Sequence, residues 1–165
     1  MSYHIYTTKG IVLSERAIGE ADRIYSILTR DFGKLEARAI GVRKNVSKLR
    51  GHIEPFSLSL ISFVKGKNYW RLTSAEFIQN ISSTEAVARS LALLEKLVQG
   101  EAPHPELFDD VEEVLLSFEP HDEMFEVNVV SKILFHLGYL KKSDMALDKK
   151  SLIKAINEGI QASHL

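Results

Sequence analysis

The basic residues between positions 34 and 50 are the clearest candidates for a chemical role in this sequence. Six cations lie within these 17 positions, opposed there only by Glu36. They are Lys34, Arg38, Arg43, Lys44, Lys48 and Arg50. Clustered cations of this kind neutralise successive phosphates of a nucleic acid. We therefore interpret the segment as part of a nucleic-acid-binding surface, with a solvated charged face as the alternative.

Other residues extend this candidate surface. Arg23, Arg30 and Arg71 are expected to lie on the same face, and Tyr25 or Tyr69 is a candidate to stack on a base. Gly41, Asn45 and Gly51 predict a mobile loop that follows an irregular phosphate backbone. The residue types leave the choice between DNA and RNA open.

No arrangement of residues in the sequence is typical of a catalytic site. Gly33-Lys34 and Gly66-Lys67 lack the upstream glycine and the following Ser/Thr of a phosphate-binding loop. Gly-x-Gly-x-x-Gly, Gly-x-Ser-x-Gly and His-Glu-x-x-His motifs do not occur. The run 121–123 (HDE) is interpreted as a cluster at a helix start. We expect no enzyme activity, no metal, no cofactor and no small-molecule substrate.

The charge divides unequally between the two halves of the chain. Residues 1–80 contain 13 Lys/Arg and 7 Asp/Glu, whereas residues 81–165 contain 8 and 15. Opposite signs predict two units with different partners, and a polyanion would bind the first. The absence of cysteine fits a reducing compartment. No signal peptide or membrane span is evident, so we expect a cytoplasmic protein without a membrane partner.

The first half has the alternating pattern of short strands. Strands are expected near residues 5–17, 23–30, 35–39, 56–60 and 69–73. In the fourth, Phe56, Leu58 and Leu60 are expected to point inward, and Ser57 and Ser59 outward. Five strands with one apolar face each are too few for a sandwich. They predict a five-stranded Greek-key barrel of the OB type, although an SH3-like barrel would show the same periodicity.

The second half has the period of α-helices. The run 82–85 (SSTE) matches a capping box and begins a helix that ends at Gly100. Further helices are expected over residues 105–120, 122–137 and 149–162. The predicted fold is therefore mixed β and α, with an OB-type barrel over 1–80 and a small helical domain over 81–165.

Eight short motifs occur in a definite order along the chain. They are 10–13 (GIVL), 19–23 (GEADR), 28–35 (LTRDFGKL), 39–44 (AIGVRK), 47–49 (SKL), 54–57 (EPFS), 105–108 (PELF) and 134–139 (LFHLGY). In this order, over roughly residues 4–140, they resemble the RecO family of recombination mediators.

The resemblance implies a DNA repair protein built from an OB barrel and a helical domain. Such a protein binds single- and double-stranded DNA, anneals complementary strands and assists the loading of recombinase. Its usual partners are RecR and the acidic C-terminal tail of the single-strand-binding protein. By position, the DNA-binding surface of the family would fall on Arg23, Lys34, Arg38, Arg43, Lys44, Lys48 and Arg50.

The sequence departs from the family pattern in two respects. Many members carry a four-cysteine zinc module after the Leu-Gly-Tyr segment, where this chain has residues 141–144 (KKSD). The chain ends at Leu165, so we expect a shortened helical domain. That domain meets the acidic tail in the family and is itself acidic here. Like charges would oppose the tail unless Lys132, Lys141 and Lys142 form a local basic pocket.

Two other classes of function remain open from the sequence. An OB-type RNA-binding protein would share the basic face and recognise 2′-hydroxyl groups. A protein-interaction adaptor would instead use the acidic helical half, with the basic loop serving solubility. Salt-dependent binding to bare oligonucleotides distinguishes the nucleic-acid-binding classes from the adaptor.

Overall fold

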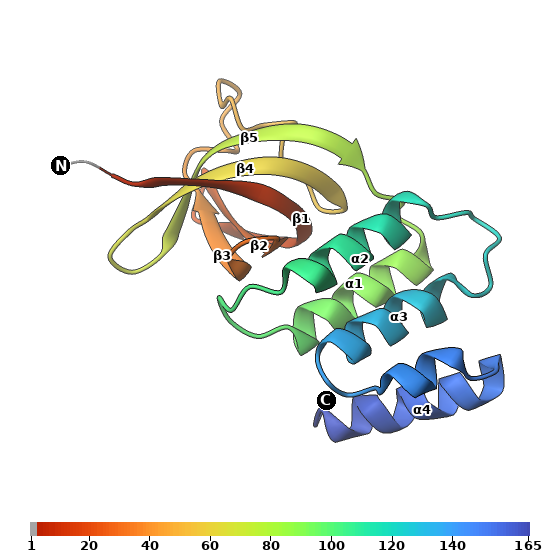
Figure 1. The fold of residues 1–165 in the computed structure, drawn as a ribbon. Helices are drawn as coiled ribbons and strands as arrows, with labels where there is room; N and C mark the ends of the chain where they lie inside the picture. Colours follow the sequence, from red (N-terminus) through yellow and green to blue (C-terminus); the bar gives the residue numbers. More distant parts are fainter. Residues whose placement is uncertain (1–2) are drawn as a thin grey trace. The chain divides into compact units, whose positions relative to one another are not determined.

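The structure is a computed structural model that describes residues 3–165 (Figure 1). It divides into two compact units. The first comprises Met1–Ile81 together with Gly100–Pro103, and the second comprises Ser82–Gln99 and His104–Leu165. Over the described residues, every helix is too short or too polar to cross a membrane.

The first unit is a closed five-stranded barrel. Its strands are β1 (Ile5–Ile18), β2 (Asp22–Thr29), β3 (Gly33–Ala39), β4 (Ser57–Lys65) and β5 (Trp70–Asn80). They follow the order β1-β2-β3-β5-β4, and the barrel closes because β1 pairs with both β2 and β4 (Figure 1). The pairing of β3 with β5 is parallel, and the other pairings are antiparallel. This order confirms the predicted OB-type Greek-key barrel.

Alternating apolar side chains of the strands fill the barrel. In β3 the predicted inward residues Leu35, Ala37 and Ala39 are buried, as are Trp70 and Leu72 in β5. The polar residues between them face outward, as the period of two requires. The sequence pattern therefore predicted which face of these two strands forms the core.

The predicted alternation is wrong in β4. Leu60 is exposed, whereas Ser57 and Ser59 are buried. The strand still alternates without a break, with Ser57, Ser59, Ile61 and Phe63 as its inward series, because the carbonyls of Glu54 and His52 accept the two buried serine hydroxyls. As a result Ile61 and Phe63 complete the core in place of Leu60.

The connection between β3 and β4 was expected to be mobile, but it is anchored to the barrel. It is a succession of turns, in which the N–H of Lys44 donates to the carbonyl of Gly41 at 3.0 Å. Val42, Leu49 and Ile53 from this connection are buried in the barrel core. The basic side chains between these apolar residues are therefore carried on a fixed backbone.

The second unit is helical. It contains α1 (Glu85–Leu97), α2 (Pro105–Leu116), α3 (Phe125–His136), the 3₁₀ turn η1 (Lys142–Ala146) and α4 (Lys149–Ala162). Within this unit α3 packs against each of the other three α-helices. Figure 1 shows it between α1 and α4. The predicted apolar positions Val87, Leu91 and Leu94 of α1 are buried.

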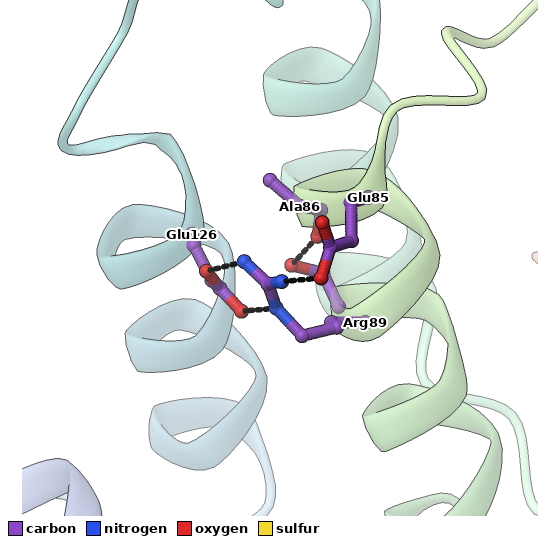
Figure 2. Close-up of polar contacts among 5 residues, drawn as sticks. Glu85, Ala86, Arg89 and Glu126 are labelled. Carbon is purple, nitrogen blue, oxygen red and sulfur yellow. Dashed lines mark hydrogen bonds and ion pairs between the residues drawn. The ribbon is translucent and has the colours of Figure 1, made fainter.

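The start of α1 differs from the predicted capping box. Thr84 is the N-cap residue, but its hydroxyl is buried and makes no hydrogen bond within the described residues. Arg89 instead ties this end of α1 to α3 (Figure 2). It donates to Glu85 Oε1 at 2.6 Å and to both carboxylate oxygens of Glu126 at 2.9 Å. Hydrogen bonds from Arg89 hold the pKa of Glu126 below its ordinary value.

Candidate nucleic-acid interface

A row of directly paired residues runs around the outside of the barrel. It passes through Arg16, Ile24, Arg38, Arg71, Val64 and Ile5, which come in turn from β1, β2, β3, β5, β4 and β1. None of the six is buried. Because directly paired residues project from the same side of a sheet, the row forms one outer stripe. Its arginines adjoin an apolar end formed by Val64 and Ile5.

Asp22 fixes the arginine at the centre of this row. Its Oδ2 atom accepts hydrogen bonds from Arg38 Nε at 2.9 Å and from Nη2 at 2.6 Å. Its Oδ1 atom accepts the N–H of Gly41 at 2.7 Å. The bonds from Gly41 and then Arg38 hold the pKa of Asp22 below its ordinary value. The ionised carboxylate thus joins the outer row to the first residue of the basic loop.

Arg38 also positions an aromatic ring. Its guanidinium carbon lies 5.5 Å from the centroid of the Tyr69 ring, which is cation–π distance. Tyr69 is 45% exposed. A ring held in this way remains available to stack on a planar ligand.

Three further arginines from the predicted set meet at one end of the barrel. Arg23, Arg43 and Arg50 line a cavity of about 340 Å³, together with Tyr25, Val42, Gly51, Ile53 and Glu54. Arg23 is ion-paired to Glu15 at 2.8 Å, and Arg43 Nη1 donates to the carbonyl of Gly19 at 3.2 Å. Hydrogen bonds and ion pairs therefore hold several guanidinium groups in a polar recess.

The expected stacking role of Tyr25 is wrong. Its side chain is 1% exposed and belongs to the barrel core. Burial raises the pKa of the Tyr25 phenol. Of the two tyrosines that the sequence suggested for stacking, only Tyr69 is accessible.

The three lysines of the predicted set occupy different positions. Lys44 and Lys48 are exposed on the anchored loop, and Lys48 has no side-chain partner within residues 3–165. Lys34 lies near the opposite end of β3 from Arg38, about 13 Å away at 3.3 Å per residue. Its backbone N–H donates to the carbonyl of Gly100 at 3.0 Å. Arg30 directly follows the end of β2 that pairs with this end of β3, and it is ion-paired to Asp31 at 3.4 Å, so its expected place on this face is wrong. The structure thus gathers the other seven cations near one end of the barrel and places Lys34 and Arg30 apart.

Sequence reasoning missed two parts of this surface. Arg16 belongs to the outer row, and it is ion-paired to Glu36 at 3.4 Å. Lys65 and Lys67 flank the β4–β5 hairpin and were not among the residues predicted to bind nucleic acid. Since this loop commonly contacts oligonucleotides in OB folds, two lysines beside it were a usable signal.

Two of the lysines considered for an acidic tail have acidic neighbours. Lys132 lies 3.5 Å from Asp110, which also binds His136 Nε2 at 2.7 Å. Burial raises the pKa of the Asp110 carboxyl, but His136 and Lys132 lower it by a larger amount, so the pKa lies below its ordinary value. Lys141 borders a cavity of about 360 Å³ whose other lining residues include Asp144 and Glu158.

Metal-ligating side chains do not gather anywhere in the described part of the chain. Within residues 3–165 no group of three or more His, Cys, Asp or Glu side chains is placed to hold a metal ion. Asp122, from the candidate run at 121–123, instead accepts the N–H of Met124 at 2.8 Å and caps the turn before α3.

Comparison with known proteins connects the barrel to one family. The family model described as "Recombination protein O N terminal" matches residues 1–81. A DNA repair protein RecO of Heliobacterium modesticaldum is 40% identical over 79 residues, which cover 48% of this chain and 29% of that protein. One of Dehalococcoides mccartyi is 42% identical over 77 residues, covering 47% and 30%.

A longer match extends into the helical unit. The DNA repair protein RecO of Caldanaerobacter subterraneus subsp. tengcongensis is 26% identical over 147 residues, which cover 83% of this chain and 60% of that protein. The chain thus spans less than two thirds of the length of each relative named here. With the family model matching residues 1–81 and these relatives sharing one name, the barrel of this chain belongs to the RecO N-terminal family.

Proposed function

We propose that this chain is a non-catalytic DNA-binding protein of DNA repair and recombination. In this proposal it binds single- and double-stranded DNA on the basic end of its barrel. Annealing of complementary strands and assistance in recombinase loading are further parts of the proposal, with RecR and the single-strand-binding protein as partners.

One observation carries the proposal more than any other. Asp22 links the arginine row to a basic loop whose backbone is pinned by buried apolar residues. Arg38 and the backbone that carries the loop cations are therefore held in place before a ligand arrives, which lowers the entropy cost of binding. Relatives of the chain that carry the name DNA repair protein RecO support DNA as the polyanion.

The contacts proposed here are with phosphates. Lys44 and Lys48 are exposed on the loop, and lysines in such positions bind phosphates as point charges. Phosphate contacts carry no base information, so binding is expected to be independent of sequence.

The experiment is fluorescence anisotropy of labelled single- and double-stranded DNA with the wild-type protein and with Lys44→Glu/Lys48→Glu. The double variant should weaken binding to all DNA sequences alike. Lys150→Glu/Lys154→Glu is the matched control, since it makes the same charge change at exposed positions of α4. The proposal fails if both double variants bind as the wild type does, or if both lose affinity equally. Preferential displacement by RNA would favour an RNA-binding function.

A further inference from the structure

A second hollow on the barrel shares no lining residue with the cavity lined by Arg23, Arg43 and Arg50. It has a volume of about 710 Å³ and is formed by the start of β1, the end of β4, the β4–β5 hairpin and the start of β5. Its lining residues are Tyr3, Ile5, Val64, Lys65, Gly66, Lys67, Asn68, Tyr69, Arg71 and Thr73. We refer to it as the hairpin groove.

The hairpin groove combines exposed apolar surface with positive charge. Tyr3, Ile5 and Tyr69 are 67%, 60% and 45% exposed, respectively. An exposed apolar cluster of this kind marks a binding site more often than isolated apolar residues do. Among the described residues that line the groove, Lys65, Lys67 and Arg71 are cationic and none is acidic. The groove therefore fits a ligand with a flat apolar face and an anionic group.

The cations of the groove differ in how freely they can meet such a ligand. Lys65 lies 3.4 Å from Glu101 and 4.9 Å from the Trp70 ring, so it already has partners. Lys67 and Arg71 have no ion pair or side-chain hydrogen bond within residues 3–165. These two are the groups available to an incoming anion.

A fixed guanidinium group contacts the aromatic part of the groove. Tyr69 contacts the guanidinium of Arg38, and Arg38 is in turn bonded to Asp22. A ring fixed in this way loses little freedom when a base stacks on it. Stacking on an aromatic side chain requires an unpaired base, because bases within a duplex are already stacked on their neighbours.

We propose that the hairpin groove binds an unpaired base of single-stranded DNA against Tyr69, with an adjoining phosphate on Lys67 and Arg71. This inference rests on the proposed function and assigns different contacts to the two surfaces. The basic loop with Lys44 and Lys48 binds phosphates of single and double strands alike. The groove contributes only to single strands, and so it sets the preference between the two.

Tyr69→Ala tests the proposal, with Tyr69→Phe as the matched control that keeps the ring. Affinity for a single strand should fall by about 5- to 150-fold in Tyr69→Ala, the range typical of one lost base stack. Affinity for a duplex of the same length should stay within about twofold, and Tyr69→Phe should bind both as the wild type does. Far-ultraviolet circular dichroism checks that each variant is folded.

A second readout follows the base itself. A strand carrying 2-aminopurine should lose fluorescence on binding the wild type and Tyr69→Phe, because stacking on an aromatic ring quenches it. The quenching should be absent with Tyr69→Ala at saturating protein. Unchanged quenching in Tyr69→Ala, or an equal loss of single- and double-strand affinity, overturns the groove proposal.

The two proposals fail in different ways. If Tyr69→Ala binds single strands normally while Lys44→Glu/Lys48→Glu loses both substrates, the groove inference is wrong and the proposed function stands. If the wild type binds neither single strands nor duplexes at low salt, the proposed function itself is wrong, and the groove proposal falls with it.

Discussion

Gly33 occupies a position where the structure leaves no room for a side chain. Its φ angle is +69°, and a Cβ atom would lie 2.5 Å from the carbonyl oxygen of Ala102. The segment Gly100–Pro103 belongs to the barrel unit and lies against this turn. It is held there by the bond from the N–H of Lys34 to Gly100. Gly33→Ala should therefore have two effects at once: it should strain the backbone at position 33, and it should displace the segment Gly100–Pro103.

The expected loss of stability has two parts. A non-glycine residue in the left-handed region costs about 1–2 kcal/mol. Moving the segment also breaks the 2.8 Å bond from Trp70 Nε1 to Glu101 and the bond to Gly100, at about 0.5–1.5 kcal/mol each. Together, Gly33→Ala should destabilise the barrel by about 2–5 kcal/mol.

Trp70 provides the assay, because it is the single tryptophan of the chain and lies at the displaced contact. Its fluorescence should follow urea unfolding of the barrel directly. Gly19→Ala is the control, since Gly19 has a φ of +59° with nothing within 4 Å of the added Cβ. The control should lose only the backbone part, about 1–2 kcal/mol. Equal losses in the two variants would refute the packing of Gly100–Pro103 on Gly33.

Two further predictions concern carboxylates whose pKa is lowered in the folded protein. Such a group stabilises the fold above its ordinary pKa, and the contribution disappears as the pH falls through the lower folded pKa. Glu126→Gln should lower the urea midpoint of the helical unit at pH 7, measured by circular dichroism. The midpoint of this variant should also depend less on pH below 4.5, the ordinary pKa of the Glu126 carboxyl. An unchanged acid profile would show that the bonds from Arg89 to Glu126 do not stabilise the fold. Asp22→Asn should release Arg38 and lower the urea midpoint reported by Trp70 fluorescence at pH 7. It should also weaken the binding of single strands more than that of duplexes. A variant with wild-type stability and wild-type DNA affinity would contradict the linking role of Asp22.

The regular parts of the fold were predictable because their signals are local. The alternation in β3 and the helical apolar stripe of α1 can be recognised in short windows. The fourth strand was not, because a buried serine looks like an outward residue in a sequence. Burial leaves no unsatisfied hydrogen-bonding group at Ser59, because its hydroxyl donates to the carbonyl of His52 at 3.1 Å. Periodicity does not reveal such a bond.

The site was predictable in composition but not in geometry. The clustering of cations at positions 34–50 pointed to the basic loop. The adjacency of Arg38 and Arg71 arises from a parallel pairing of strands that are distant in the chain. The contact of Arg38 with the Tyr69 ring depends on the same pairing, whereas the link through Asp22 depends on the antiparallel pairing of β2 with β3. Interactions of this range are set by topology, and a single sequence does not display them.

The most direct test of the proposed function is the salt dependence of single-stranded DNA binding by the wild-type chain, measured by anisotropy. About six phosphate contacts predict that log affinity falls with log salt concentration at a slope near −4. A slope of that size, with RNA failing to displace the DNA preferentially, would support a basic barrel that binds DNA through its phosphates. A slope near zero, or no binding at low salt, would contradict it and show that the basic loop is only a solvated face.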